Sequence, residues 1–308
     1  MDKQSLVREF LKKGVLVSPS TLQDMEDGKI EKELPPAEAK SSVVLGEKKK
    51  GMRCTLRGAA AEKGSMTPED AVRTYRERFE KLRGLLLRKT DAVSVKNAVR
   101  ENSKVSVIGM VREADASSFL LEDTTGTIPV RSSVKVLPDD VLSATGWVRD
   151  GTLIAESLAY PDISISHDVA CASGRLLLSF ASGPGAGNAD VVITPDTLKD
   201  AYGEKRLQTP AWAFIEDASG AAVSVFIYAH EGPVDQNLAL SWLRRRVVGS
   251  PGPFARGNAS VLDREPDIFW AIGTNEPWTT NYKGVTIVSF GKGRQALVDL
   301  GTRDISMA

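Results

Sequence analysis

The feature that most restricts the fold is a series of short strand-like segments between residues 104 and 155. Apolar and β-branched residues form strand patterns at 105–111, 119–122, 127–130, 141–148 and 152–155. Thr125-Gly126 and Asp150-Gly151 supply turns between neighbouring segments. Five short strands with glycine breaks in about 50 residues predict a small Greek-key barrel of the OB type.

A helix is predicted immediately before the barrel. Thr67-Pro68-Glu69-Asp70 combines a capping hydroxyl, an early proline and acidic residues in the first turn. The apolar residues that follow recur at intervals of three and four, namely Val72, Tyr75, Phe79, Leu82 and Leu86. We therefore expect residues 67–165 to form a helix packed on the next domain, followed by the barrel.

The N-terminal third divides into two predicted segments. Apolar residues from Leu6 to Leu11 recur at helical spacing, so residues 1–32 are predicted to form a small helical module. Residues 33–66 contain few large apolar side chains and are predicted to be a flexible basic linker. Residues 48–112 hold seventeen Lys or Arg against seven Asp or Glu. This basic excess indicates one of two things: a surface that binds phosphates or acidic partners, or a solvated linker followed by an exposed helix face.

Residues 166–308 alternate between two kinds of pattern. Residues 190–193 and 222–228 are strand-like, and residues 237–247 have helical spacing with Leu240 and Leu243 on the apolar side. The alternation predicts a layered domain of strands and helices. The expected fold class is therefore α+β, with several domains.

Composition excludes some classes of protein. Forty basic residues balance forty acidic residues, so no overall field attracts the chain to nucleic acid or to an anionic membrane. Cys54 and Cys171 lack the spacing of a metal knuckle or a redox pair, and no apolar run reaches the ~20 residues of a membrane span. A cytoplasmic protein in a reducing environment is expected, with no membrane contact.

Several motifs occur in the same order as in a known family. They are Val105–Val111, Leu121–Gly126, Asp139–Val141, Tyr160–Ile163, Ile227–Gly232, Pro266–Phe269, Gly273–Glu276, Tyr282–Val285 and Ser289–Gln295. These motifs and the order of the parts resemble the small subunit of archaeal family D DNA polymerase. The resemblance implies an OB barrel at 67–165 and a calcineurin-like α/β phosphoesterase domain, here shortened and degenerate, at 166–308.

In the family that the chain resembles, a Gly-His-X-His segment supplies imidazoles to a pair of metal ions. Thr274 and Glu276 occupy those histidine positions here, and the chain has only two histidines, His167 and His230. The other metal motifs of the family are absent between residues 166 and 210. We therefore expect neither a metal nor a cofactor, with His230 as the remaining candidate ligand. An alternative is that Glu276 acts as an oxygen ligand near His230 and Asp267.

Direct binding of DNA is expected to be weak. Single-strand-binding barrels use aromatic platforms, but Phe119 and Trp147 lie within apolar strand runs and are predicted to be core residues. Candidates for contact with the DNA backbone are basic side chains of the barrel and of the helix at 237–247, namely Arg131, Lys135, Arg149, Arg244, Arg245 and Arg246. The three consecutive arginines fit equally well the solvated face of that helix.

The resemblance implies a non-catalytic accessory subunit of an archaeal replicative DNA polymerase, associated with the nucleoid and docked on the large catalytic subunit. One alternative is a metal-dependent 3′–5′ exonuclease or phosphodiesterase subunit of the same polymerase, for which manganese or another divalent ion would be the cofactor. The other is a single-stranded DNA-binding OB protein.

Overall fold

The computed structural model describes residues 16–17, 44–45, 52–58, 67–165, 167–181, 189–200, 203–249, 261–291 and 293–307. The chain divides into two compact units, Met1–Met52 and Arg53–Ala308. In the first unit, β1 (Leu16–Val17) pairs in parallel with β2 (Val44–Leu45). The rest of the predicted helical module at 1–32 lies outside the described residues.

Part of the predicted linker is a strand. Residues Arg53–Gly58 form β3, which pairs antiparallel with β13 (Ala211–Glu216) at the edge of a sheet. Burial alternates along this segment: Met52 and Cys54 are buried, whereas Arg53 and Thr55 are exposed. This alternation has the period of a half-buried strand. The linker prediction is therefore wrong for these six residues, and it remains a prediction for the rest of 33–66.

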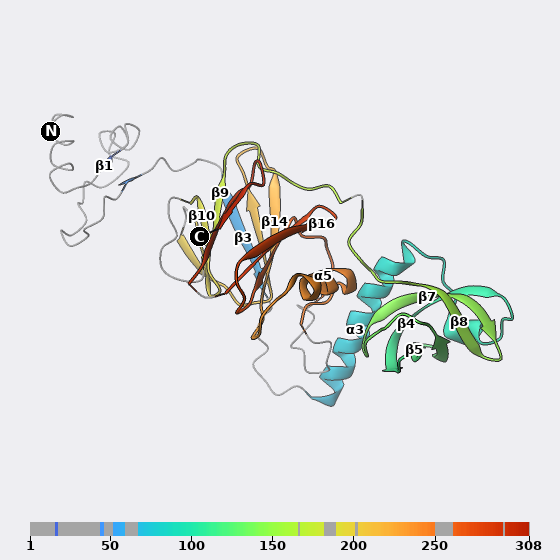
Figure 1. The fold of residues 1–308 in the computed structure, drawn as a ribbon. Helices are drawn as coiled ribbons and strands as arrows, with labels where there is room; N and C mark the ends of the chain where they lie inside the picture. Colours follow the sequence, from blue (N-terminus) through green and yellow to red (C-terminus); the bar gives the residue numbers. More distant parts are fainter. Residues whose placement is uncertain are drawn as a thin grey trace, which may run out of the picture. The chain divides into compact units, whose positions relative to one another are not determined.

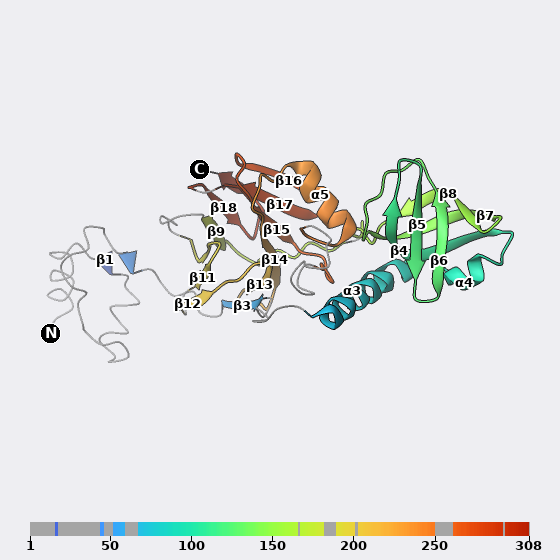
Figure 2. The same cartoon turned by 90° about the horizontal axis from the view of Figure 1, so that it is seen from below.

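Helix α3 (Pro68–Leu87) confirms the predicted helix before the barrel. The Thr67 hydroxyl accepts a hydrogen bond from the Asp70 N–H at 3.2 Å, and the Asp70 carboxylate accepts one from the Thr67 N–H at 3.2 Å. This reciprocal cap stabilises the first turn. Phe79, Leu82 and Leu86 are buried against the barrel strands, as the apolar stripe predicts. Figure 2 shows α3 leading directly to the barrel.

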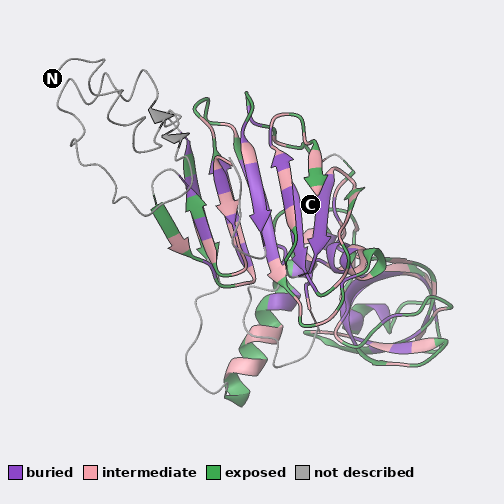
Figure 3. Cartoon of the chain, turned by 60° about the vertical axis from the view of Figure 1, so that its left-hand side comes forward, coloured by how far each residue is buried: buried purple, intermediate pink, exposed green. Residues whose placement is uncertain are grey.

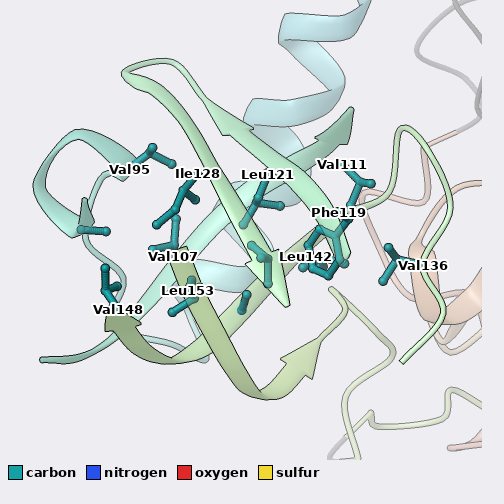
Figure 4. Packing of buried hydrophobic residues seen from close by; sticks show 13 residues of the cluster. Val95, Val107, Val111, Phe119, Leu121, Ile128, Val136, Leu142, Val148 and Leu153 are labelled. Atoms are coloured by element: carbon teal, nitrogen blue, oxygen red, sulfur yellow. The ribbon is translucent and has the colours of Figure 1, made fainter. Parts of the chain in front are cut away.

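The five predicted strands of the barrel are all present, and they close on themselves. Their order around the closed barrel is β4 (Lys104–Ala114), β5 (Ser118–Asp123), β6 (Gly126–Arg131), β8 (Thr152–Ala159) and β7 (Val141–Arg149). The pairing of β6 with β8 is parallel, whereas the other pairings are antiparallel. The inward side chains form a continuous apolar core, to which the short helix α4 (Val95–Ala98) contributes Val95 and Ala98 (Figure 4).

Gly146 permits close pairing at one point of the barrel. The register between β7 and β8 shifts at Thr145 and Gly146. A Cβ atom on Gly146 would lie 1.9 Å from the carbonyl oxygen of Ile154. Only glycine fits this approach, which explains the glycine break within an otherwise apolar strand.

Outside the barrel, the second unit contains two six-stranded sheets (Figure 1), to which β3 contributes from before the barrel. The first has the order β12 (Gly203–Arg206), β11 (Thr197–Asp200), β10 (Val191–Ile193), β9 (Leu177–Ala181), β18 (Gln295–Asp299) and β19 (Ile305–Met307). The second has the order β16 (Trp278–Tyr282), β17 (Val285–Phe290), β15 (Ile268–Ile272), β14 (Ala222–Ala229), β13 and β3.

The second sheet is covered on both faces. On one face, the Trp270 ring contacts Phe180 of the first sheet, with ring centroids 4.8 Å apart. On the other face, Trp242 and Leu243 of helix α5 (Gln236–Arg245) join the same apolar cluster as Phe269. Strands β15 and β17 are consequently buried along their whole length, and they are purple in Figure 3.

The described residues form a β-rich, multidomain fold with few helices. Helix α5 confirms the helical pattern predicted at 237–247, with Leu243 buried and Leu240 half-buried. None of the helices in the described part of the chain is long and apolar enough to cross a membrane.

Candidate functional site

Three parallel strands end together at one edge of the second sheet. Ala229 pairs with Ile272, and Ile272 pairs with Phe290, at the carboxyl ends of β14, β15 and β17. The next residue after β14, His230, donates its backbone N–H to the Ile272 carbonyl at 2.8 Å. The loop after β15 starts at Gly273. The edge therefore brings His230 beside the loop that holds Thr274 and Glu276.

The side chain of Asn275 holds this loop against the sheet. Its amide oxygen accepts a hydrogen bond from the Val234 N–H at 3.0 Å, and its amide nitrogen donates to the Ser289 hydroxyl at 3.1 Å. A Cβ atom on Gly273 would lie 2.4 Å from that amide oxygen. The glycine and the asparagine of the motif therefore have a structural role that does not depend on metal.

Thr274 and Glu276 lie on the exposed side of the same loop. The Glu276 side chain is 85% exposed, and its carboxylate pairs with Arg294 at 3.1 Å. The half-buried His230 ring lies edge-on to Trp242, with ring centroids 5.4 Å apart. Each of the three candidate positions has an ordinary structural environment, and Glu276 shares a surface ion pair of small energetic value.

This set of donors does not fit a pair of metal ions. A dinuclear centre needs several carboxylate and imidazole ligands around two ions a few ångströms apart. The three candidate positions, His230, Thr274 and Glu276, carry one imidazole, one hydroxyl and one exposed carboxylate with an arginine partner. Within the described ranges, no group of three or more His, Cys, Asp or Glu side chains is placed to hold a metal ion.

Asp267 lies at the other end of β15, so its expected proximity to His230 is wrong. It precedes Ile268, and the five residues of β15 separate it from Gly273, a distance of roughly 20 Å along the strand. Its carboxylate accepts hydrogen bonds from the Ser224 hydroxyl at 2.6 Å and from the Ala170 N–H at 2.8 Å. These bonds anchor neighbouring segments at the start of the strand.

The second histidine also lies at that end. The Nδ1 atom of His167 is 3.3 Å from the Glu265 carboxylate, and its Nε2 atom is 3.8 Å from the Asp267 carboxylate. The chain's two imidazoles are therefore at opposite ends of one strand and cannot share a metal ion.

The three consecutive arginines point in different directions because α5 ends among them. Arg245 is the last helical residue, and Arg246 adopts a left-handed conformation with φ of 56°. Arg244 is exposed, and its guanidinium lies 5.6 Å from the centre of the Tyr160 ring. Among the three, Arg244 alone retains the solvent access that a phosphate contact requires.

Arg245 and Arg246 form internal ion pairs. Arg245 pairs with the buried Asp140 of the barrel, and Arg246 pairs with Glu265. Burial lowers the pKa of the Arg246 guanidinium, an effect that Glu265 opposes. The predicted solvated helix face is wrong for these two residues, because their charged groups pair inside the fold. Their predicted contact with DNA stays a prediction.

The basic candidates on the barrel are exposed at separate places. Arg131 lies at the end of β6, Lys135 in the loop that follows, and Arg149 at the end of β7. Phe119 is buried, as predicted, but Trp147 is 44% exposed. The prediction that Trp147 is a core residue is wrong, because strand alternation directs Gly146 and Val148 inward and Trp147 outward.

A pocket of about 590 Å³ lies beside Arg244, at a site that the sequence did not indicate. Lys89 and Lys283, which follow α3 and β16, line it together with Tyr160 and Asp162. Tyr160 and Asp162 belong to one of the motifs noted in the sequence and Lys283 to another, but the two motifs and the other lining residues are distant in sequence. Only the folded chain brings them together.

Comparison with known proteins supports the family resemblance. The DNA polymerase II small subunit of Archaeoglobus fulgidus is 29% identical over 176 residues, which cover 53% of this chain and 34% of that protein. The chain therefore spans about a third of the length of the relative it matches. No family model matches the chain. The match confirms the similarity to the small-subunit family that the motifs indicate.

Proposed function

We propose that this protein is a non-catalytic accessory subunit of a replicative DNA polymerase and that it binds the large catalytic subunit. The similarity to a DNA polymerase small subunit over 176 residues carries the proposal. Because the match spans only part of that relative, the binding of a large catalytic subunit is part of the proposal.

The fold supports the finer assignment of both domains. A closed five-stranded barrel with one parallel contact, between its third and fifth strands in chain order, is consistent with an OB barrel. Two facing sheets with parallel strands that end at one edge are consistent with a calcineurin-like phosphoesterase fold. At that edge, Asn275 retains the loop geometry while positions 274 and 276 carry a threonine and an ion-paired glutamate.

These features favour a structural role for the second domain. A dinuclear centre generates a bridging hydroxide and clamps the phosphate, which requires the missing donors. We accordingly assign the protein no metal and no cofactor. Its proposed role is to provide a binding surface for the catalytic subunit.

Coexpression with the large polymerase subunit of the same cell tests the proposal. We expect the two chains to copurify through size-exclusion chromatography at micromolar concentration. Replacing His230 and Thr274 with Ala should leave the complex intact, because these side chains supply no metal ligands. Separate elution of the two chains would refute the assignment.

Metal analysis of the same preparation tests the exonuclease alternative. A non-catalytic subunit should contain no stoichiometric manganese, iron or zinc after dialysis, and it should release no nucleotides from a labelled 3′ end. Two tightly held metal ions per chain, with nuclease activity lost on His230→Ala, would instead establish the exonuclease.

One observation favours a second candidate function, binding of single-stranded DNA by the barrel. Trp147 presents an exposed aromatic ring, and exposed aromatics stack on bases with ~1–3 kcal/mol per contact. If the barrel binds bases, Trp147→Ala should weaken oligonucleotide binding about tenfold, whereas Ile154→Ala on the neighbouring strand should have little effect. Equal affinities for the two variants would remove this candidate.

A further inference from the structure

The pocket beside Arg244 contains more positive than negative charge. Three cationic side chains line it, those of Lys89, Arg244 and Lys283, against the single carboxylate of Asp162. That carboxylate already accepts hydrogen bonds from the Lys283 ammonium at 2.6 Å and from the Tyr282 hydroxyl at 3.0 Å. It is therefore committed within the fold, and one carboxylate cannot balance three cations.

Among the described residues, Lys89 donates hydrogen bonds to main-chain oxygens only. Its ammonium donates to the carbonyls of Pro161 at 2.7 Å and of Asp162 at 3.1 Å. Burial, and then the nearby Arg246, lower the pKa of Lys89, and the charges of Asp162 and Glu265 oppose this shift only in part. Within the described part of the chain, neither Lys89 nor Arg244 forms an ion pair with a carboxylate. A bound anion would offset the unfavourable charge of the pocket.

The cations retain unused donors. An ammonium has three N–H donors, and Lys89 and Lys283 each use two of them on oxygens of the segment 161–163. Each lysine can therefore donate one more hydrogen bond. The Arg244 guanidinium has five donors and lies over the face of Tyr160, and it forms no side-chain hydrogen bond with any residue that the structure describes.

The chemistry of these donors fits a phosphate group. Two ammonium groups and a guanidinium fork can bond several oxygens of one tetrahedral anion. The Tyr160 ring is covered by Arg244, so it is not free to stack on a base. Recognition in this pocket would therefore depend on phosphate and would not depend on base sequence.

We infer that this pocket binds a backbone phosphate of a nucleic-acid strand, with Arg244, Lys89 and Lys283 as the ligands of the phosphate. The choice of a strand rests on the proposed function, since a polymerase subunit lies close to DNA. The pocket's position between the barrel exit and the end of α5 would fix the path of that strand along the junction.

Fluorescence anisotropy with a fluorescein-labelled oligothymidylate and the full-length isolated chain tests the inference. Arg244→Gln should weaken binding about tenfold. It should also make the slope of log K against log salt concentration shallower by about one unit, because one fewer phosphate is neutralised. Arg206→Gln is the matched control, because it removes an exposed arginine from β12, which contributes no residue to the pocket lining. It should change the affinity less than about twofold. Circular dichroism verifies that both variants are folded.

Two results would overturn the inference. One is that Arg244→Gln binds the oligonucleotide as tightly as the unaltered chain or weakens no more than Arg206→Gln. The other is that inorganic phosphate or a nucleoside triphosphate binds as tightly as the strand, which would identify a free phosphate compound as the ligand. The binding measurement uses the isolated chain and does not depend on the large subunit. If the two subunits copurify but Arg244→Gln does not weaken oligonucleotide binding, the phosphate site is refuted and the proposed function stands.

Discussion

At the scale of single residues, identical side chains have different roles in this protein because their surroundings differ. Arg244 is exposed, whereas Arg245 and Arg246, which follow it directly, form ion pairs inside the fold. The two cysteines show the same contrast, since Cys54 is buried in β3 and Cys171 is exposed. Position in the fold, more than residue type, decides the chemistry of each side chain.

The cysteines should therefore react at very different rates. Burial is the largest of the effects that raise the pKa of Cys54 to about 12. At pH 8 its reactive thiolate is roughly one part in ten thousand, and the thiol is also shielded. We expect Ellman's reagent to modify Cys171 quickly in the native protein and Cys54 only after unfolding. In the Cys171→Ser variant, no thiol of the native protein should react quickly with the reagent. A fast reaction of Cys54 in that variant would contradict the buried position of β3.

At the scale of secondary-structure elements, helix α3 joins sequence to tertiary packing. Its cap and its apolar stripe are local signals, and both are present in the structure. The stripe is not equally buried along the helix, however. Leu86, near the end of the helix, is fully buried against the barrel. Val72, near its start, is 61% exposed. The C-terminal half of the helix therefore supplies most of the packing energy.

Two alanine substitutions in α3 measure this difference. Leu86→Ala should lower the free energy of unfolding by about 2–5 kcal/mol, because it leaves a cavity in a packed core. Val72→Ala should change it by less than ~0.5 kcal/mol, because it alters an exposed side chain. Urea denaturation followed by circular dichroism gives both values. Similar losses for the two variants would mean that α3 packs along its whole length.

At the scale of the whole second unit, buried contacts join the barrel to the sheets. Asp140 of the barrel accepts hydrogen bonds from Arg245 at the end of α5 and from the Tyr160 hydroxyl, the latter at 3.1 Å. Val247 and Val261, from the segments flanking the sheets, share an apolar cluster with α3. The junction therefore combines a buried ion pair with apolar packing.

Removing the charge of Asp140 should weaken this junction. Asp140→Asn leaves the Arg245 guanidinium without its carboxylate, and breaking a buried pair in this way costs about 3 kcal/mol. We expect a lower unfolding temperature and a separation of the barrel transition from that of the sheets in calorimetry. Asp115→Asn, which alters an exposed aspartate of the barrel, is the control and should unfold like the unaltered chain. A single unshifted transition in Asp140→Asn would show that apolar contacts alone join the two parts.

The family resemblance could be recognised in the sequence because it depends on residue identity at motif positions, and the proposed lack of metal ligands rests on the same positions. Thr274 and Glu276, which stand where the family that the chain resembles has histidines, are visible without coordinates. The separation of Asp267 from His230 was not, because it depends on which end of β15 each residue occupies. The exposure of Trp147 follows from strand alternation, but the apolar residues on both sides of it conceal that pattern.

The sequence by itself determined the local structure: the capped helix α3, the five barrel strands and the glycine turns between them. These depend on interactions between residues close in the chain, which leave periodic signals. Only the tertiary structure decided that β3 joins a sheet, that Arg245 and Arg246 are internal, and that Lys89, Arg244 and Lys283 share a pocket. Each of these results depends on strand pairing and domain packing between distant residues, and the free energy of such contacts leaves no signal in the order of neighbouring amino acids.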